Sequence, residues 1–173
     1  GSASPSVSAT PNLTAGDVSQ GNNNGNTTLL TTTSPSSGYT GASGSYNAGV
    51  AARTNAFSTA SGGSAYFEFT LTPSTGYTLV MTNLAFGARY TATGPASFCV
   101  RSSLDSYAAD LATGTIGTDS KWYLKSVALA ATSTLASAAV TFRIYGYGGS
   151  GNASAGTANW RIDDLTVWAY AVA

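Results

Sequence analysis

The sequence contains no histidine and only one glutamate, Glu68, among its 173 residues. The lack of histidine excludes Ser-His-Asp and Cys-His catalytic arrangements and removes the usual zinc ligand. A two-carboxylate glycosidase needs only two acids, and the possible partners of Glu68 are Asp105, Asp110, Asp119 and Asp164. Seven acidic residues allow many accidental pairings, so the sequence predicts a protein that is not an enzyme.

Charge is also scarce. Charged residues make up 8% of the chain, against about 25% in a typical globular protein. Seven Lys and Arg balance seven Asp and Glu, so the net charge is zero. We therefore expect no nucleic-acid partner, and no apolar run approaches the length needed for membrane insertion. Polarity comes from Ser, Thr, Asn and 20 Gly, a mixture typical of extracellular β-proteins.

Cysteine gives little information, because Cys99 is the only one and cannot form a disulfide within the chain. It lies in a strand-like stretch, where we expect a buried, unreactive thiol. Gly1-Ser2 has the character of a cloning scar, and we assign residues 1–10 to that scar and a linker. Residues 11–173 have the length of a single domain.

From residue 65 onward, apolar and polar residues alternate in segments separated by Gly-, Ser- or Thr-rich turns. In AYFEFTLT, Phe67, Phe69 and Leu71 fall on one face. Helical periodicity is nearly absent. Further strands are expected within residues 77–92, 97–103, 122–130, 139–147 and 160–170, and a long surface loop is expected at 34–49. About eight to ten short strands predict an all-β fold, a two-sheet antiparallel β-sandwich of the jelly-roll type.

The segment TFRIYGY carries the first candidate binding residues. Strand alternation places Arg143, Tyr145 and Tyr147 on one face, opposite the apolar residues between them. Aromatic rings offer flat apolar platforms to the C–H faces of sugars, and Arg donates hydrogen bonds to hydroxyls or carboxylates. The alternative is cross-strand packing of these side chains on a solvated sheet face.

A second candidate cluster lies in VRSSLDSYAADL, where Arg101 and Asp105 share a period of two and Tyr107 follows. An Arg–Asp pair that lies beside hydroxyl groups and an aromatic ring can bind a polyol through hydrogen bonds. The same pair could equally be a local salt bridge that closes a loop. Further stacking candidates are Tyr39, Tyr46, Trp122 and Trp160, whereas Trp168 is expected in the core or at the sheet edge.

Asp163 and Asp164 stand side by side in WRIDDLTVW. Ile162, Leu165 and Val167 share one face of a strand only if a bulge adds a residue at the Asp pair. An inward carboxylate then needs a partner, and both an Arg and a hard cation such as calcium fit that role. No D-x-D-x-D-G run is present to choose between them.

YFEFTLTP, VRSSLD, FRIYGYGGSG and above all NWRIDDLTV resemble segments of secreted bacterial jelly-roll domains. The W-x-I-D-D-x-x-V ending resembles the last strand of carbohydrate-binding modules and MAM-type domains. The resemblance implies a non-catalytic polysaccharide-binding module, secreted or at the cell surface and appended to a larger protein. It also implies a structural calcium at Asp163 or Asp164, with Glu68 as a weaker candidate ligand. The alternatives are a structural or adhesive domain with a protein partner and, more distantly, a glycoside hydrolase or polysaccharide lyase.

Overall fold

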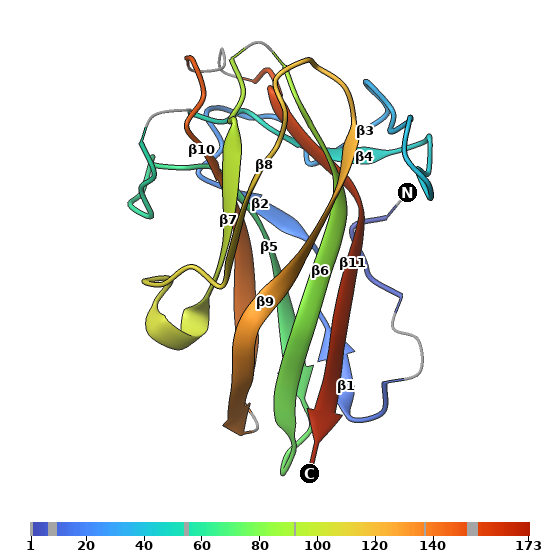
Figure 1. Ribbon diagram of the computed structural model, residues 1–173, viewed down its shortest axis with the longest axis vertical. Helices are drawn as coiled ribbons and strands as arrows, with labels where there is room; N and C mark the ends of the chain where they lie inside the picture. Colours follow the sequence, from blue (N-terminus) through green and yellow to red (C-terminus); the bar gives the residue numbers. More distant parts are fainter. Residues whose placement is uncertain (1, 7–9, 54–55, 92, 137, 152–155) are drawn as a thin grey trace.

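The chain folds into two antiparallel sheets packed face to face, which confirms the expected jelly-roll β-sandwich (Figure 1). The computed structural model describes residues 2–6, 10–53, 56–91, 93–136, 138–151 and 156–173. Sheet A contains, in spatial order, β1 (Leu13–Ala15), β5 (Tyr66–Pro73), β10 (Val140–Tyr147), β7 (Ser97–Ser102) and β8 (Ala112–Thr115), with β2 (Ser19–Gly21) also beside β5. Sheet B contains β3 (Leu30–Thr31), β4 (Asn47–Val50), β11 (Trp160–Val172), β6 (Thr78–Tyr90) and β9 (Tyr123–Ala136).

The helical content of the described residues is one 3-10 turn, η1 (Ser103–Asp105). In the same part of the chain, no helix is long and apolar enough to cross a membrane.

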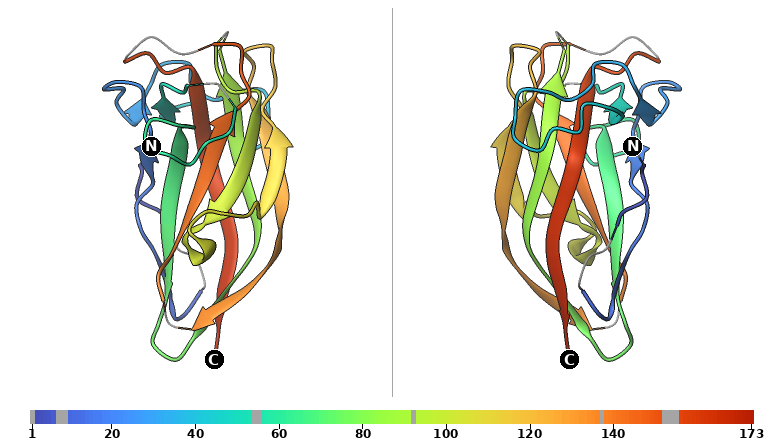
Figure 2. Two further views of the ribbon diagram at one scale, coloured as in Figure 1. Left: turned by 90° about the vertical axis from the view of Figure 1, so that its left-hand side faces the viewer. Right: turned by 90° about the vertical axis from the view of Figure 1, so that its right-hand side faces the viewer.

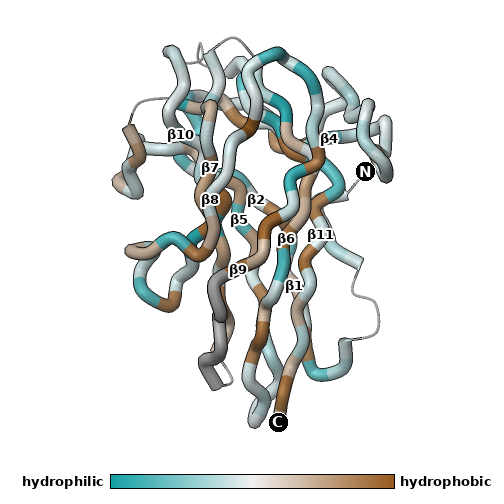
Figure 3. The backbone as a smooth tube through the Cα atoms, viewed as in Figure 1, coloured by the Kyte–Doolittle hydropathy of each residue, from teal (hydrophilic) through white to brown (hydrophobic). Residues whose placement is uncertain are grey.

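Strand alternation sets which side chains enter the core. In β5 the burial alternates residue by residue, and Phe67, Phe69 and Leu71 are buried as expected. The tube in Figure 3 shows the corresponding change between hydrophobic and hydrophilic residues along the strands. Arg143 in β10 lies directly across from Glu68 in β5, so these two polar side chains share the outer face of sheet A.

Aromatic side chains join the two sheets through the core. The rings of Phe67 in sheet A and Trp160 in sheet B have centroids 4.8 Å apart, and those of Phe86 and Phe98 are 5.2 Å apart. Trp160 is fully buried. Its expected role in stacking on a ligand is therefore wrong, because its indole fills the space between the sheets.

One expected loop is partly a strand. The Ser/Gly-rich segment 34–49 was expected to lie entirely on the surface, but Asn47–Val50 forms β4 and Ala48 belongs to the core. The preceding residues, 32–46, form a loop that crosses the upper part of β11, as Figure 2 shows. Small residues allow this segment to pack closely, which a simple scan for large apolar residues does not detect.

Candidate functional site

The outer face of sheet A brings together five of the six residues named as glycan ligands. Arg143, Tyr145 and Tyr147 project from β10, and Arg101 lies directly across from Arg143 on β7. Tyr107 reaches the same face from the loop after η1, since its ring lies over the Arg143 guanidinium. The two clusters that the sequence suggested separately therefore form one surface.

Arg143 organises the centre of this surface. Its guanidinium carbon lies 4.1 Å from the ring centroid of Tyr66 and 4.0 Å from that of Tyr107. Its Nε donates to Oε2 of Glu68 at 2.8 Å, and its Nη1 donates to the Tyr145 hydroxyl at 3.1 Å. Burial lowers the pKa of Arg143, but the hydrogen bonds to Tyr145 and Glu68 outweigh this effect and raise it. We call these five residues the Arg143 cluster.

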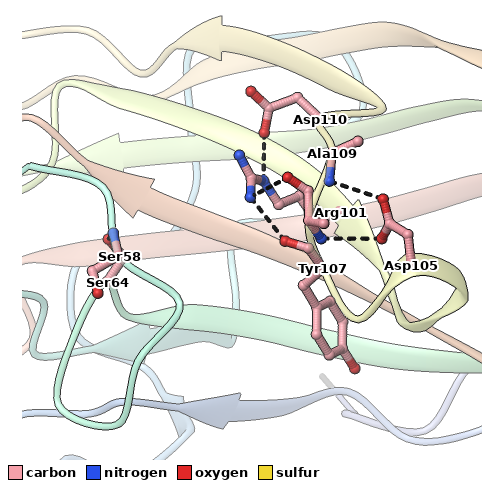
Figure 4. Close-up of polar contacts among 8 residues, drawn as sticks. Ser58, Ser64, Arg101, Asp105, Tyr107, Ala109 and Asp110 are labelled. Carbon is pink, nitrogen blue, oxygen red and sulfur yellow. Dashed lines mark hydrogen bonds and ion pairs between the residues drawn. The ribbon is translucent and has the colours of Figure 1, made fainter.

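Arg101 does not pair with Asp105, so that expected pair is wrong. Its Nε donates instead to Oδ1 of Asp110 at 2.5 Å, and its Nη1 donates to the carbonyl oxygens of Tyr107 and Ala108, each at 2.8 Å (Figure 4). The guanidinium thereby ties the loop to β7. The alternative that the Arg101–Asp105 pair is a local salt bridge is therefore also wrong in its acid: a salt bridge closes the loop, but Asp110 supplies the carboxylate.

Asp105 stabilises the same loop through hydrogen bonds to its backbone. Its carboxylate accepts hydrogen bonds from the backbone N–H groups of Ala108 and Ala109, at 3.1 and 2.8 Å. Ser106 and Tyr107 both adopt positive φ, which carboxylate capping of the turn helps to hold. Asp105 therefore acts on the position of Tyr107, and its oxygens are directed at the backbone.

The tyrosines of this face differ in accessibility. Tyr145 is fully buried, packed edge-on against the rings of Phe57 and Tyr66. Its ring cannot be offered to a ligand, which is the cross-strand packing that the sequence kept as an alternative. Tyr66, Tyr107 and Tyr147 stay partly exposed, and burial raises the pKa of each of them. Three fixed rings thus remain at the surface.

Cys99 lies on this face as well, directly across from Tyr145. The thiol is free and buried, as expected from the sequence. Burial, and next the nearby Asp110, raises its pKa to about 12. A thiol that stays protonated at neutral pH is a poor nucleophile, so Cys99 serves packing.

The double aspartate lies in sheet B, and the expected bulge is confirmed. Between Asp163 and Thr166 the register of β11 against β6 shifts, and Asp164 adopts a positive φ of 51°. Because of this extra residue, Ile162, Leu165 and Val167 all pack on the core side of β11.

Among the described residues, the side chains that donate to the two carboxylates are Tyr39 and Ser43, and not an Arg. Oδ2 of Asp164 accepts from the Tyr39 hydroxyl at 2.5 Å and from the backbone N–H of Ser43 at 3.1 Å. Oδ2 of Asp163 accepts from the Ser43 hydroxyl at 2.9 Å. Burial, and next the bond to Asp164, raises the pKa of Tyr39. The pair therefore holds the 32–46 loop onto the sheet.

Gly87 makes room for this contact. A Cβ at position 87 would lie 2.1 Å from the Tyr39 hydroxyl oxygen, so only glycine lets Tyr39 rest on β6. The same relation recurs on sheet A, where the Tyr66 ring lies over Gly21.

Glu68 cannot share a calcium ion with Asp163 and Asp164, because it projects from sheet A and they project from sheet B. Within the described residues, no group of three or more His, Cys, Asp or Glu side chains gathers as a metal site. Calcium prefers six to eight oxygen ligands. The calcium expectation rests on the sequence.

Two aromatic residues that the sequence did not single out as ligands are the most accessible ones on β11. Trp168 and Tyr170 are each 48% exposed. Trp168 was expected in the core or at the sheet edge, and it lies at the edge, on the part of β11 that β4 does not pair with. Trp122, proposed for stacking, is buried, and its indole N–H donates to the carbonyl of Ser34. The signal for the exposed pair was their spacing of two in a strand whose intervening residues are apolar.

No family model and no curated protein matches this chain. Among solved structures, a CBM4 structure is similar over 70% of this chain and 68% of that chain, with 14% identity and a TM-score of 0.44. The K3 cleaved adhesin domain of Lys-gingipain from Porphyromonas gingivalis W83 is similar over 76% and 78%, with 16% identity and a TM-score of 0.42.

The enzymatically active domain of tailspike protein 4 from bacteriophage CBA120 is similar over 94% of this chain and 20% of that chain, with 16% identity and a TM-score of 0.45. These similarities concern the fold alone.

Proposed function

We propose that this chain is a non-catalytic carbohydrate-binding module of a secreted or cell-surface bacterial protein, with its glycan site on the outer face of sheet A. The observation that carries the proposal is the guanidinium of Arg143 held between the rings of Tyr66 and Tyr107. This arrangement keeps partly exposed rings in fixed positions beside hydroxyl groups.

Fixed rings suit a sugar ligand for a physical reason. A pyranose presents an apolar C–H face, which packs on an aromatic ring, and an equatorial rim of hydroxyls, which needs hydrogen bonds. Rings that are already ordered lose little rotamer entropy on binding, so more of the contact energy is retained as affinity. Tyr66, Tyr107 and Tyr147 supply both the rings and phenolic hydroxyls.

The charge of the site favours an uncharged polysaccharide as the partner. Both arginines of this face already have a carboxylate partner, Arg143 with Glu68 and Arg101 with Asp110. Neither guanidinium is free to pair with the carboxylate of an acidic sugar.

The proposal that the module is non-catalytic rests on Glu68. Its Oε2 accepts from Arg143 and its Oε1 accepts from the Ser19 hydroxyl at 3.2 Å. A glycosidase directs an acid at the glycosidic oxygen, with a second carboxylate across the sugar. Both oxygens of Glu68 are directed at protein donors instead.

Affinity electrophoresis in gels that contain neutral or acidic polysaccharides tests this function. We expect a neutral polysaccharide to retard the wild-type protein, and Tyr107→Ala and Tyr147→Ala each to weaken binding about tenfold, since each removes one stacking ring. Tyr123→Ala is the matched control, because Tyr123 is an exposed tyrosine on β9 of the other sheet. Far-UV circular dichroism verifies that each variant is folded.

An absence of retardation by every polysaccharide would contradict the proposal and favour the adhesive alternative with a protein partner. Turnover of any polysaccharide that Glu68→Gln abolishes would contradict the non-catalytic part alone.

A further inference from the structure

The second half of β11 lies at an open edge of sheet B. On one side β11 pairs with β6 along nearly its whole length, from Trp160 to Val172. On the other side β4 pairs only with Trp160–Ile162. Within the described residues, no strand pairs with the remainder of this side, and Figure 1 shows β3 and β4 beside only the upper end of β11.

Trp168 and Tyr170 project from this open part of β11. The alternation after the bulge turns them away from the core, while Val167 and Ala169 pack against it. Neither ring takes part in the aromatic or cation contacts found among the described residues. The two rings are therefore half exposed and, within the described residues, are not enclosed by other rings or a cation as those of the Arg143 cluster are.

A groove of about 880 Å³ runs beside them, between β11 and the edge of sheet A. Trp168 and Tyr170, which face outward from β11, lie at its rim together with the half-exposed Tyr46. Phe69 and Leu71 contribute apolar surface from the core side, and N-terminal residues 2–6 and 10 line the groove as well. Its volume lies in the range of small-ligand sites, about 300–1,000 Å³. Side chains two apart on a strand are separated by about 7 Å, so the rings can support successive units of an extended ligand.

The size of the patch argues against a protein as its occupant. A fully buried aromatic side chain covers about 150–250 Å², so the two half-exposed rings and the exposed Val172 beside them offer roughly 250 Å² of apolar surface. A stable protein interface needs about 800 Å² from each partner.

The charge of the groove narrows the ligand class further. Its charged lining residues are Asp163 and Asp164, both acidic, so nucleic acids and acidic glycans are disfavoured. The rest of the polar lining consists largely of serine and threonine, whose hydroxyls can hydrogen-bond to a sugar.

We propose that Trp168 and Tyr170 form a second glycan-binding site in the β11 groove, which takes an extended, uncharged glycan chain. The site lies on the opposite sheet from the Arg143 cluster and shares no residue with it. A glycan chain long enough to reach both sites, or two separate chains, would bind with higher avidity than either site alone provides.

Tryptophan fluorescence tests the second site separately from the first. The chain has three tryptophans, and Trp122 and Trp160 are buried, so acrylamide quenches mainly Trp168. We expect saturating cellohexaose, xylohexaose or mannohexaose to shift the emission to the blue and to protect Trp168 from acrylamide. Tyr170→Ala should weaken this response about tenfold, and Tyr123→Ala should leave it unchanged.

The double variant Tyr107→Ala/Tyr147→Ala removes two of the three partly exposed rings on sheet A and should keep the Trp168 response. Loss of the response in that variant, or retardation by a polysaccharide without any protection of Trp168, would overturn the second site and leave the proposed function standing. Failure of all three hexasaccharides and all polysaccharides would overturn both. Dimerisation in sedimentation velocity that Trp168→Ala abolishes would assign the groove to a second copy of the chain and overturn the proposal.

Discussion

The outer faces of the two sheets use aromatic residues in opposite ways. On sheet A, the rings of Tyr66 and Tyr107 enclose the guanidinium of Arg143, and Tyr145 is buried beneath them. On β11, Trp168 and Tyr170 project from an open edge with no such partner among the described residues. Strand pairing and the position of a cation, more than aromatic content, therefore decide which rings are held by contacts within the chain and which project without them.

The sharpest test of this difference compares Tyr145 on β10 with Tyr170 on β11. Tyr145→Ala should lower the free energy of unfolding by about 3–4 kcal/mol, because it leaves a cavity under the cluster. Tyr170→Ala should lower it by less than about 1 kcal/mol, since the ring is half exposed. Urea unfolding measures both values. Similar losses in the two variants would show that the faces do not differ as described.

The cation on sheet A should matter more than a cation at the surface. Arg143→Met should cost about 2 kcal/mol, because it removes two ring contacts and leaves the partly buried Glu68 without its guanidinium partner. Lys121→Met is the control: its 3.8 Å ion pair with Asp119 is exposed, so solvent screens it and its loss should change the free energy of unfolding little. Equal costs in urea unfolding would refute the organising role of Arg143.

On sheet B, the hydrogen bonds that hold the 32–46 loop to Asp164 should contribute a similar or smaller amount to the free energy of unfolding. Asp164→Ala should cost about 1–2 kcal/mol, since it removes the acceptor for Tyr39 and Ser43 and places alanine at a positive φ. Asp164→Asn should cost less, because asparagine tolerates this conformation and keeps an acceptor oxygen. Hydrogen exchange should accelerate in the loop of the alanine variant. Unchanged exchange would mean that the carboxylate does not hold the loop.

The dependence of stability on pH should come mainly from the tyrosines and from Cys99, because burial raises the pKa of the Cys99 thiol from 9.0 to about 12. Burial raises the pKa of Tyr39, Tyr66 and Tyr107 above the ordinary value of 10.0, so the folded chain holds these protons longer than the unfolded chain. Their contribution is fully present below pH 10 and is lost as the pH rises through the folded pKa values. Without histidine, stability should stay flat around neutral pH. Urea unfolding across this pH range measures the free energy of unfolding. A maximum of that free energy at alkaline pH would contradict the raised pKa values of these tyrosines.

The smallest expected effect is that of metal removal. The carboxylates of Asp163 and Asp164 already accept hydrogen bonds from Tyr39 and Ser43, so EDTA should leave the melting temperature unchanged. A fall in melting temperature that added calcium reverses would contradict this expectation and support the calcium prediction made from the sequence.

Features that depend on neighbouring residues could be predicted from the sequence. Alternation placed Arg143 and Tyr147 on one face, and the failure of alternation at Asp163 and Asp164 located the bulge. The partner of Arg101 could not be predicted in this way, because Asp110 reaches it only through the positive φ angles of the intervening loop.

Long-range pairing set the other differences. The accessibility of Trp168 depends on where β4 stops pairing with β11, and the partners of the Asp pair lie more than a hundred residues away in the chain. Composition and the local spacing of residues do not predict contacts of this kind.

The most direct test of the whole account is an NMR titration with the hexasaccharide that binds most tightly. We expect chemical-shift changes at the backbone amides of Tyr107, Arg143 and Tyr147 on sheet A and at the indole N–H of Trp168 on β11, with the indoles of the two buried tryptophans unaffected. Shift changes confined to other loops, or absent from both faces at saturation, would contradict the claim that these two aromatic surfaces bind glycans.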